Sequence, residues 1–258
     1  MILHHELRGE GSRRTVLLHG FLGAGRNLGV IPRRWSDADR SFLLADLTGH
    51  GRSQPIPAGE LSLEGMARDL LETLDRVGWQ RVRIVGHSLG GRVGLMLRRL
   101  APGRLAHLDL LDITPGPVTG GDADAVLAAL RAAPEQAPDR STMVRALQDG
   151  GLPEPLVEWL SMNLERDGEG VRWRFDRAAL ERFHFRFRGT DLWREVAAAP
   201  QQTRALVGGR SEYVPRADRA RLESLGVEVE VVAGAGHFVH AERPDAVVDW
   251  LKAAGSGV

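Results

Sequence analysis

The chain has 258 residues, of which 43% are hydrophobic and 26% are charged, and its 34 Lys and Arg residues balance its 34 Asp and Glu residues. A formal net charge of zero gives no electrostatic basis for binding nucleic acid or an anionic membrane, so neither is predicted as a partner. The absence of cysteine excludes disulfides, cysteine nucleophiles and thiolate metal sites, and we expect neither a metal ion nor another cofactor.

The sequence also bears on localisation. Its N-terminal segment lacks a basic region followed by an apolar stretch, so it does not resemble a secretory signal. No run of about 18 apolar residues is present, so a membrane span is not expected. We therefore expect a soluble, cytoplasmic protein, and the sequence leaves its oligomeric state open.

The first half of the chain alternates short apolar runs with helical patterns. Strands are predicted at residues 2–7, 15–18, 41–45, 81–85 and 105–111. Helices are predicted at residues 27–35, 61–77 and 92–100. Because the strands are continuously apolar rather than alternating, they favour a mostly parallel sheet covered by helices on both faces.

The pattern changes after residue 115. Ala- and Arg-rich helical segments follow, and the first strand-like stretch among them is at residues 171–175. Strands at 203–207 and 227–232 and helices at 216–225 and 243–254 then restore the alternation. We therefore predict an α/β core formed by residues 1–116 and 201–258, with residues 117–200 inserted as a helical cap or lid.

Residues 86–91, G-H-S-L-G-G, lie between a predicted strand and a predicted helix. This is the context that the G-x-S-x-G nucleophile elbow requires. The turn is so tight that a Cβ atom at Gly86 or Gly90 would collide with neighbouring backbone, and the serine is forced into a strained conformation. The motif predicts Ser88 as a nucleophile presented at the carboxyl edge of the sheet.

A serine nucleophile needs a base and an oxyanion hole. His237 is the predicted base because it follows the last predicted strand on a loop of small residues, A-G-A-G. The backbone N–H groups of Phe21 and Leu89 are the predicted oxyanion hole. Leu89 directly follows the nucleophile, and Phe21 lies in a glycine-rich loop after an apolar strand.

The orienting acid has two candidates. In proteins with this elbow, an aspartate usually follows the strand that corresponds to residues 203–207. Here that position holds Ser211, with Glu212 next to it. Asp112 ends the strand at 105–111, which we expect to lie between the serine strand and the strand at 203–207. Asp112 is preferred and Glu212 is kept as the alternative, whereas Asp109, inside the same strand, is predicted to be structural.

Three further residues are assigned to the substrate pocket. His87 precedes the nucleophile and is expected to shape the elbow or the pocket. Trp159 and Phe185 belong to a group of aromatic residues in the insertion, which fit an acyl pocket as well as they fit the insertion's own core. No metal site is predicted.

The residues above resemble the α/β-hydrolase superfamily over essentially the whole chain, and more closely its YbfF-type bacterial esterases and their mammalian mitochondrial relatives. The resemblance is carried by H-G-F-L-G at 19–23, the elbow, D-I-T-P at 112–115, G-G-R-S-E-Y-V at 208–214 and A-G-A-G-H-F at 233–238. It implies an α/β-hydrolase fold, an acid at Asp112, and an esterase with thioesterase activity on acyl-CoA as a further implication.

The predicted function is a serine hydrolase of small-molecule esters or thioesters that acts through an acyl-enzyme on Ser88 and needs no cofactor. Three alternatives stay open. The S-L-G-G-R elbow is similar to that of a menaquinone-pathway lyase, in which Arg92 would bind a carboxylate. C–C bond hydrolysis and perhydrolysis can use the same triad. A non-catalytic ligand receptor on a hydrolase fold is the third. Acyl length, leaving group and enantiopreference are not fixed by the sequence.

Overall fold

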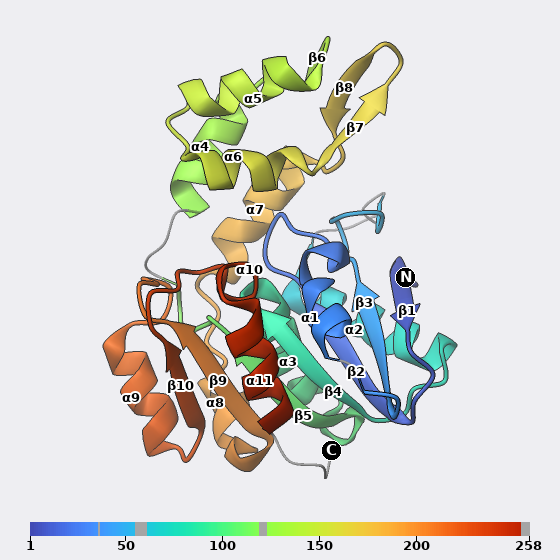
Figure 1. The fold of residues 1–258 in the computed structure, drawn as a ribbon, viewed down its shortest axis with the longest axis vertical. Coiled ribbons are helices and arrows are strands. Elements are labelled where there is room, and N and C mark those ends of the chain that lie inside the picture. Colours follow the sequence, from blue (N-terminus) through green and yellow to red (C-terminus); the bar gives the residue numbers. More distant parts are fainter. Residues whose placement is uncertain (36, 55–60, 119–122, 254–258) are drawn as a thin grey trace.

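The computed structural model describes residues 1–35, 37–54, 61–118 and 123–253 (Figure 1). Its centre is a seven-stranded sheet in the order β1-β3-β2-β4-β5-β9-β10. Neighbouring strands are parallel except β1, which pairs antiparallel with β3. The predicted mostly parallel sheet is confirmed. The strands are β1 (His5–Arg8), β2 (Arg13–Leu18), β3 (Arg40–Ala45), β4 (Val82–His87), β5 (Leu105–Leu111), β9 (Thr203–Gly208) and β10 (Glu228–Val232).

Helices cover both faces of this sheet. The core helices are α1 (Val30–Arg34), α2 (Leu63–Arg76), α3 (Leu89–Leu100), α8 (Trp193–Ala197), α9 (Arg216–Ser224), α10 (Val239–Glu242) and α11 (Pro244–Ala253), with 3₁₀ turns η1 (Gly25–Leu28), η2 (Pro102–Arg104) and η3 (Pro200–Gln202). Because successive strand residues point to opposite faces, Val16 and Ile84 pack with α2 and α3, while Leu17 and Val85 pack with α1 and α11. Both layers are visible in Figure 1.

The predicted element boundaries mostly agree with the structure. The helix predicted at 27–35 is divided at Gly29 into η1 and α1, and Pro32 lies inside α1. The last helix ends at Ala253, and the predicted end at Ala254 lies outside the described residues. None of the helices within the described ranges is long and apolar enough to cross a membrane.

The inserted segment lies above the sheet in Figure 1. It contains α4 (Ala123–Ala132), α5 (Arg140–Asp149), α6 (Glu154–Ser161) and α7 (Arg177–Phe187), together with β6 (Gln136–Ala137), β7 (Leu164–Asp167) and β8 (Gly170–Trp173). These strands form a second, antiparallel sheet in the order β6-β8-β7. The expected strand near 171–175 therefore has two partners that the sequence did not indicate. The cap boundaries at 117 and 200 stay a prediction. Although α8 lies inside that range, it contacts helix α3 of the core, because Glu195 of α8 forms an ion pair with Arg99 of α3 at 2.6 Å.

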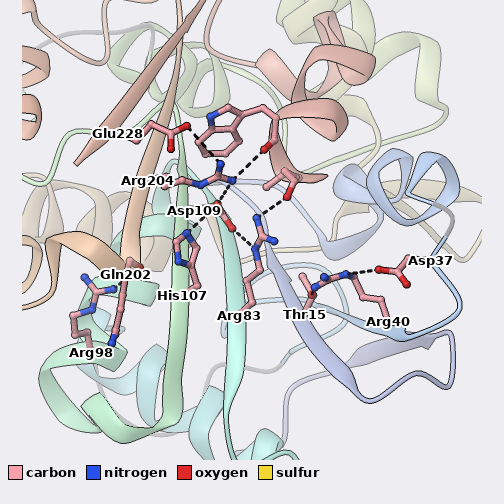
Figure 2. Close-up of polar contacts among 12 residues, drawn as sticks. Thr15, Asp37, Arg40, Arg83, Arg98, His107, Asp109, Gln202, Arg204 and Glu228 are labelled. Atoms are coloured by element: carbon pink, nitrogen blue, oxygen red, sulfur yellow. Dashed lines mark hydrogen bonds and ion pairs between the residues drawn. The ribbon is translucent and has the colours of Figure 1, made fainter. Parts of the chain in front are cut away.

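A buried polar network joins α11 to the sheet away from its carboxyl edge (Figure 2). Arg83 Nε donates to Asp109 Oδ2 at 2.6 Å, and Arg204 Nη2 donates to Asp109 Oδ1 at 3.0 Å. The two guanidinium groups also donate to main-chain carbonyls of α11. Burial raises the pKa of Asp109, but the charge and hydrogen bond of Arg83 and the adjacent His107 together outweigh burial and hold that pKa well below its usual range. These contacts support the structural role predicted for Asp109.

Candidate active site

Ser88 lies in the sharp turn between β4 and α3. Its backbone adopts φ 51° and ψ −116°, a strained conformation for a non-glycine residue. A Cβ at Gly86 would lie 2.4 Å from the Gly91 nitrogen, and one at Gly90 would lie 2.2 Å from the Leu18 oxygen. The two glycines thus let the turn close, and the serine is held at the first turn of α3, where the helix dipole favours negative charge.

Asp112 and His237 are joined directly. Asp112 follows β5, is fully buried and has φ 50°. His237 Nδ1 lies 2.7 Å from Asp112 Oδ2, within hydrogen-bond range. Since an ionised carboxylate only accepts hydrogen bonds, this contact favours the His237 hydrogen on Nδ1 and leaves the lone pair of Nε2 free. The order β4-β5-β9 confirms that β5, which Asp112 follows, lies between the strand before Ser88 (β4) and the strand at 203–208 (β9).

Further donors hold the Asp112 carboxylate in place. The backbone N–H of Gly208 donates to Oδ1 at 2.8 Å, and the Ser211 hydroxyl donates to Oδ2. Ser211, at the usual position of an acid, therefore supports the carboxylate of Asp112. The Tyr213 ring stacks on the His237 imidazole, with centroids 3.7 Å apart and an interplanar angle of 17°. Together these contacts orient both members of the pair.

The alternative acid does not take part in this arrangement. Glu212 is exposed to solvent, and its side chain is not among the groups that contact His237. Ser211 faces Asp112, whereas Glu212, one residue further along the chain, faces solvent, as expected from the sequence. The geometry therefore favours Asp112 over Glu212.

The backbone N–H groups of Leu89 and Phe21 belong to the two segments that meet at Ser88. Leu89 is the first residue of α3, so its N–H has no acceptor within the helix. Phe21 lies in the loop after β2, where a Cβ at Gly20 would lie 2.8 Å from His87 Nδ1. Within the described ranges, neither N–H donates to another protein group. Both predicted oxyanion-hole donors are therefore free for a ligand.

A cavity between the sheet edge and the cap contains these groups. Its free volume is about 70 Å³. Ser88 and His237 line it from the core, and Trp159 lines it from α6. The other lining residues are Gly20, Phe21, Leu22, His87, Arg92, Asp112, Ile113, Thr114, Val118, Ala123, Val126, Leu156, His184, Phe187, Tyr213 and Phe238. The predicted pocket residues His87 and Trp159 are thus in this lining.

Phe185 does not fit its predicted place. Its side chain is 53% exposed and does not line the cavity. On α7 the buried side chains are Leu180, Phe183, His184 and Phe187. This spacing of three and four residues defines one helix face, and residue 185 lies off that face. Applying helical periodicity to residues 180–187 would have selected His184 and Phe187 instead.

Two buried histidines, His87 and His240, lie beside His237. His87 Nε2 donates to the His237 carbonyl oxygen at 2.9 Å, so it holds the loop that carries His237. Burial, with His240 and His237 nearby, lowers the pKa of His87 well below 6.5. Burial also lowers the pKa of His240 to about 3. Both His87 and His240 are therefore neutral at pH 7.

The site has no visible metal-binding cluster. Over the described ranges, no group of three or more His, Cys, Asp or Glu side chains is arranged to hold a metal ion. Asp46, in the loop after β3, instead accepts from the backbone N–H groups of Gly25 and Arg52 at 2.7 and 2.8 Å. Asp46 thus fixes the loop after β3 to the segment that follows the Phe21 loop.

Comparisons with known proteins agree with this architecture. Residues 15–250 match the model of the alpha/beta hydrolase family. The chain is 32% identical to Esterase YbfF of Escherichia coli over 92% of this chain and 91% of that protein. It is 30% identical to the sn-1-specific diacylglycerol lipase ABHD11 of Mus musculus, over 92% of this chain and 80% of that one.

A solved structure is similar over nearly the full length. The structure of a marine microorganism esterase superposes with a TM-score of 0.86 at 25% sequence identity, covering 97% of this chain and 98% of that one. The family model, the full-length similarity to YbfF and the shared fold lead to the same assignment. This chain belongs to the alpha/beta hydrolase family and is similar to its YbfF-like esterases.

Proposed function

We propose that this protein is a serine hydrolase of small carboxylic esters, with Ser88 as nucleophile, His237 as base and Asp112 as the orienting acid. The observation that carries the proposal is the 2.7 Å contact between His237 Nδ1 and the buried Asp112 carboxylate, at a cavity that Ser88 also lines. The names of the relatives, an esterase and a diacylglycerol lipase, support the same reaction class.

Acylation begins when the Ser88 hydroxyl oxygen attacks the ester carbonyl carbon. His237 Nε2 takes the hydroxyl proton, and the Asp112 carboxylate stabilises the resulting imidazolium through Nδ1–H. The tetrahedral intermediate carries its negative charge on the former carbonyl oxygen. The N–H groups of Phe21 and Leu89 are the proposed donors to that oxygen.

Collapse of the intermediate breaks the bond to the leaving group. His237 returns the proton to the leaving alkoxide, and the acyl group stays on Ser88 as an ester. His237 then takes a proton from water, whose oxygen attacks the acyl carbon. Collapse of the second tetrahedral intermediate releases the carboxylic acid, and His237 returns the proton to Ser88. The reaction therefore balances without a cofactor.

The same sequence of steps hydrolyses thioesters, because a thiolate is a better leaving group than an alkoxide. We therefore extend the proposal to acyl thioesters as a second substrate class. The apolar lining contributed by Val126, Leu156 and Phe187 suits an acyl chain. A free volume of about 70 Å³ favours a short one.

The lyase alternative depends on Arg92, whose guanidinium would have to bind a substrate carboxylate. Arg92 is 2% exposed, and its Nη1 donates to the carbonyl oxygens of Thr114 and Gly116 at 2.9 and 2.8 Å. Its Nη2 donates to the carbonyls of Phe187 and Thr190. Because the four terminal N–H groups are committed to the two chain connections of the cap, we rank the lyase reaction below ester hydrolysis.

The direct test compares the parent protein with Ser88→Ala on p-nitrophenyl acetate. The proposal predicts that turnover falls by several orders of magnitude while the melting temperature stays close to that of the parent. Equal rates in the two proteins would rule out the mechanism. A receptor with an inactive triad would give no Ser88-dependent turnover in the parent.

A further inference from the structure

His184 is a buried polar residue of the cap that has no role in the proposed reaction. It lies on the cavity-facing side of α7, and its side chain is 5% exposed. Its ring packs on Phe21, with ring centroids 5.1 Å apart, and on Phe187, at 5.3 Å. Because Phe21 also carries one of the proposed oxyanion-hole donors, His184 packs against a residue beside which the ester carbonyl would bind.

The Nδ1 atom of His184 is buried and has no hydrogen-bond partner in the described part of the chain. A buried polar atom without a partner is unfavourable, because it has lost water and gained nothing in return. The other cap side chains that line the cavity provide no hydrogen-bond partner for this atom. They are Val118, Ala123, Val126, Leu156, Trp159 and Phe187, none of which presents a strong hydrogen-bond acceptor or a hydroxyl group. Among the cavity-lining side chains of the cap's described residues, His184 is thus the one that carries a strong potential acceptor.

The surroundings of the ring decide which role Nδ1 plays. His184 Nε2 lies 3.8 Å from Asp124 Oδ1, while Arg188 Nη1 donates to the same carboxylate oxygen at 3.0 Å, and Glu181 is also close enough to act on the imidazole charge. Burial, with Arg188 nearby, lowers the pKa of His184, so the ring is neutral at pH 7. A neutral imidazole has one N–H. The Asp124 carboxylate is 3.8 Å from Nε2, too far for a hydrogen bond, but its negative charge favours the hydrogen on Nε2 over Nδ1. Nδ1 is then an acceptor with a free lone pair.

We propose that His184 is a specificity-determining residue whose Nδ1 accepts a hydrogen bond from a hydroxyl or amide N–H group of the substrate. The inference rests on the proposed ester hydrolysis and narrows its substrate class to esters with such a donor close to the scissile carbonyl. A substrate without the donor leaves the buried Nδ1 unpaired, and discrimination against that substrate follows from the missing hydrogen bond.

The test uses pairs of esters in which a methyl group replaces a hydroxyl of similar size. For the acyl side, p-nitrophenyl 3-hydroxybutanoate is compared with p-nitrophenyl 3-methylbutanoate. For the alcohol side, 2-hydroxyethyl butanoate is compared with propyl butanoate by titration of the released acid. The parent should prefer the hydroxylated member of at least one pair by about tenfold in kcat/KM, the ratio expected for one hydrogen bond.

Two substitutions at His184 separate hydrogen bonding from packing. His184→Phe keeps a ring against Phe21 but removes the acceptor. The preference for the hydroxylated ester should therefore disappear, while activity on the ester that has a methyl group in place of the hydroxyl persists. His184→Asn places an amide oxygen near the position of Nδ1 and should retain part of the preference. Arg182→Ala, at an exposed position of α7, is the control that should leave the ratio unchanged. If His184→Phe fails to fold, His184→Leu removes the same acceptor with a smaller side chain.

The inference is overturned if the parent prefers neither hydroxylated ester, or if the preference survives in His184→Phe. These results would leave ester hydrolysis itself intact. Failure of the parent to hydrolyse any of the four esters would refute the proposed function and this inference with it, so the two failures are distinguishable.

Discussion

Replacing Asp112 with Asn tests the assignment of the acid at a single side chain. The carboxylate is fully buried and accepts three hydrogen bonds, from His237, Ser211 and the backbone of Gly208. An amide has nearly the same shape but only one oxygen. If that oxygen stays on Gly208, the amide N–H₂ faces His237, which must then accept at Nδ1 and carry its proton on Nε2. This tautomer cannot take a proton from Ser88.

The expected loss follows from these contacts. Hydrogen bonds to a charged group contribute about 1.5–3 kcal/mol each, and two of the three are reversed by the amide. Adding the stabilisation of the imidazolium, we expect kcat/KM to fall by about 10³- to 10⁴-fold, which corresponds to about 4–5.5 kcal/mol. KM should change much less, because the carboxylate has no role in binding the ester.

The assay is p-nitrophenyl acetate hydrolysis at pH 7 to 8, with the melting temperature measured for each variant. Glu212→Gln is the matched control, because it makes the same carboxylate-to-amide change one residue from Ser211 and at an exposed position. It should retain activity within about threefold of the parent. A severe loss in Glu212→Gln with little loss in Asp112→Asn would refute the assignment.

Three other variants or conditions give independent predictions. Ser211→Ala removes one donor to Asp112 and should lower kcat/KM by about 10- to 100-fold without loss of folding, measured with the same ester. Asp109→Asn leaves Arg83 and Arg204 without their buried counter-charge and should lower the free energy of unfolding by about 3–5 kcal/mol in urea titrations at pH 7. Because the folded-state pKa of Asp109 is depressed, its stabilisation is present above the unfolded pKa of about 4 and is lost as the pH falls below it. The parent should therefore lose more stability than Asp109→Asn between pH 5 and pH 3, and an equal loss would contradict the network. In a series of p-nitrophenyl esters, kcat/KM should fall more than about tenfold from butanoate to hexadecanoate, because the cavity's free volume is about 70 Å³; a rise would contradict a small acyl pocket.

The sequence was sufficient where local backbone chemistry decides the structure. The elbow at residues 86–91 needs glycines at fixed positions, and the strand and helix around it have strong apolar patterns, so the place of Ser88 followed directly. The preference for Asp112 depended on strand order, which alternating strands and helices constrain well. That Ser211 donates to Asp112 was not predicted, because a missing acid says nothing about what its replacement contacts.

The cap was harder to predict. β6 has two residues, and β7 reads L-E-R-D, so neither strand has the apolar alternation that identifies a strand. Their pairing with β8 depends on contacts brought together by the surrounding helices rather than on local propensity. Phe185 was assigned to the pocket as one of several aromatic residues, whereas the orientation of α7 gives that place to His184 and Phe187.

The central claim, that Ser88 is an activated nucleophile, is tested most directly by a fluorophosphonate probe followed by peptide mass spectrometry. The parent protein should carry one covalent phosphonate adduct on Ser88, formed rapidly and abolished by Ser88→Ala. Asp112→Asn should slow labelling, because the base is no longer held in its productive tautomer. Absence of an adduct at Ser88 in the folded parent protein, or equal labelling of the Ser88→Ala variant, would contradict the account.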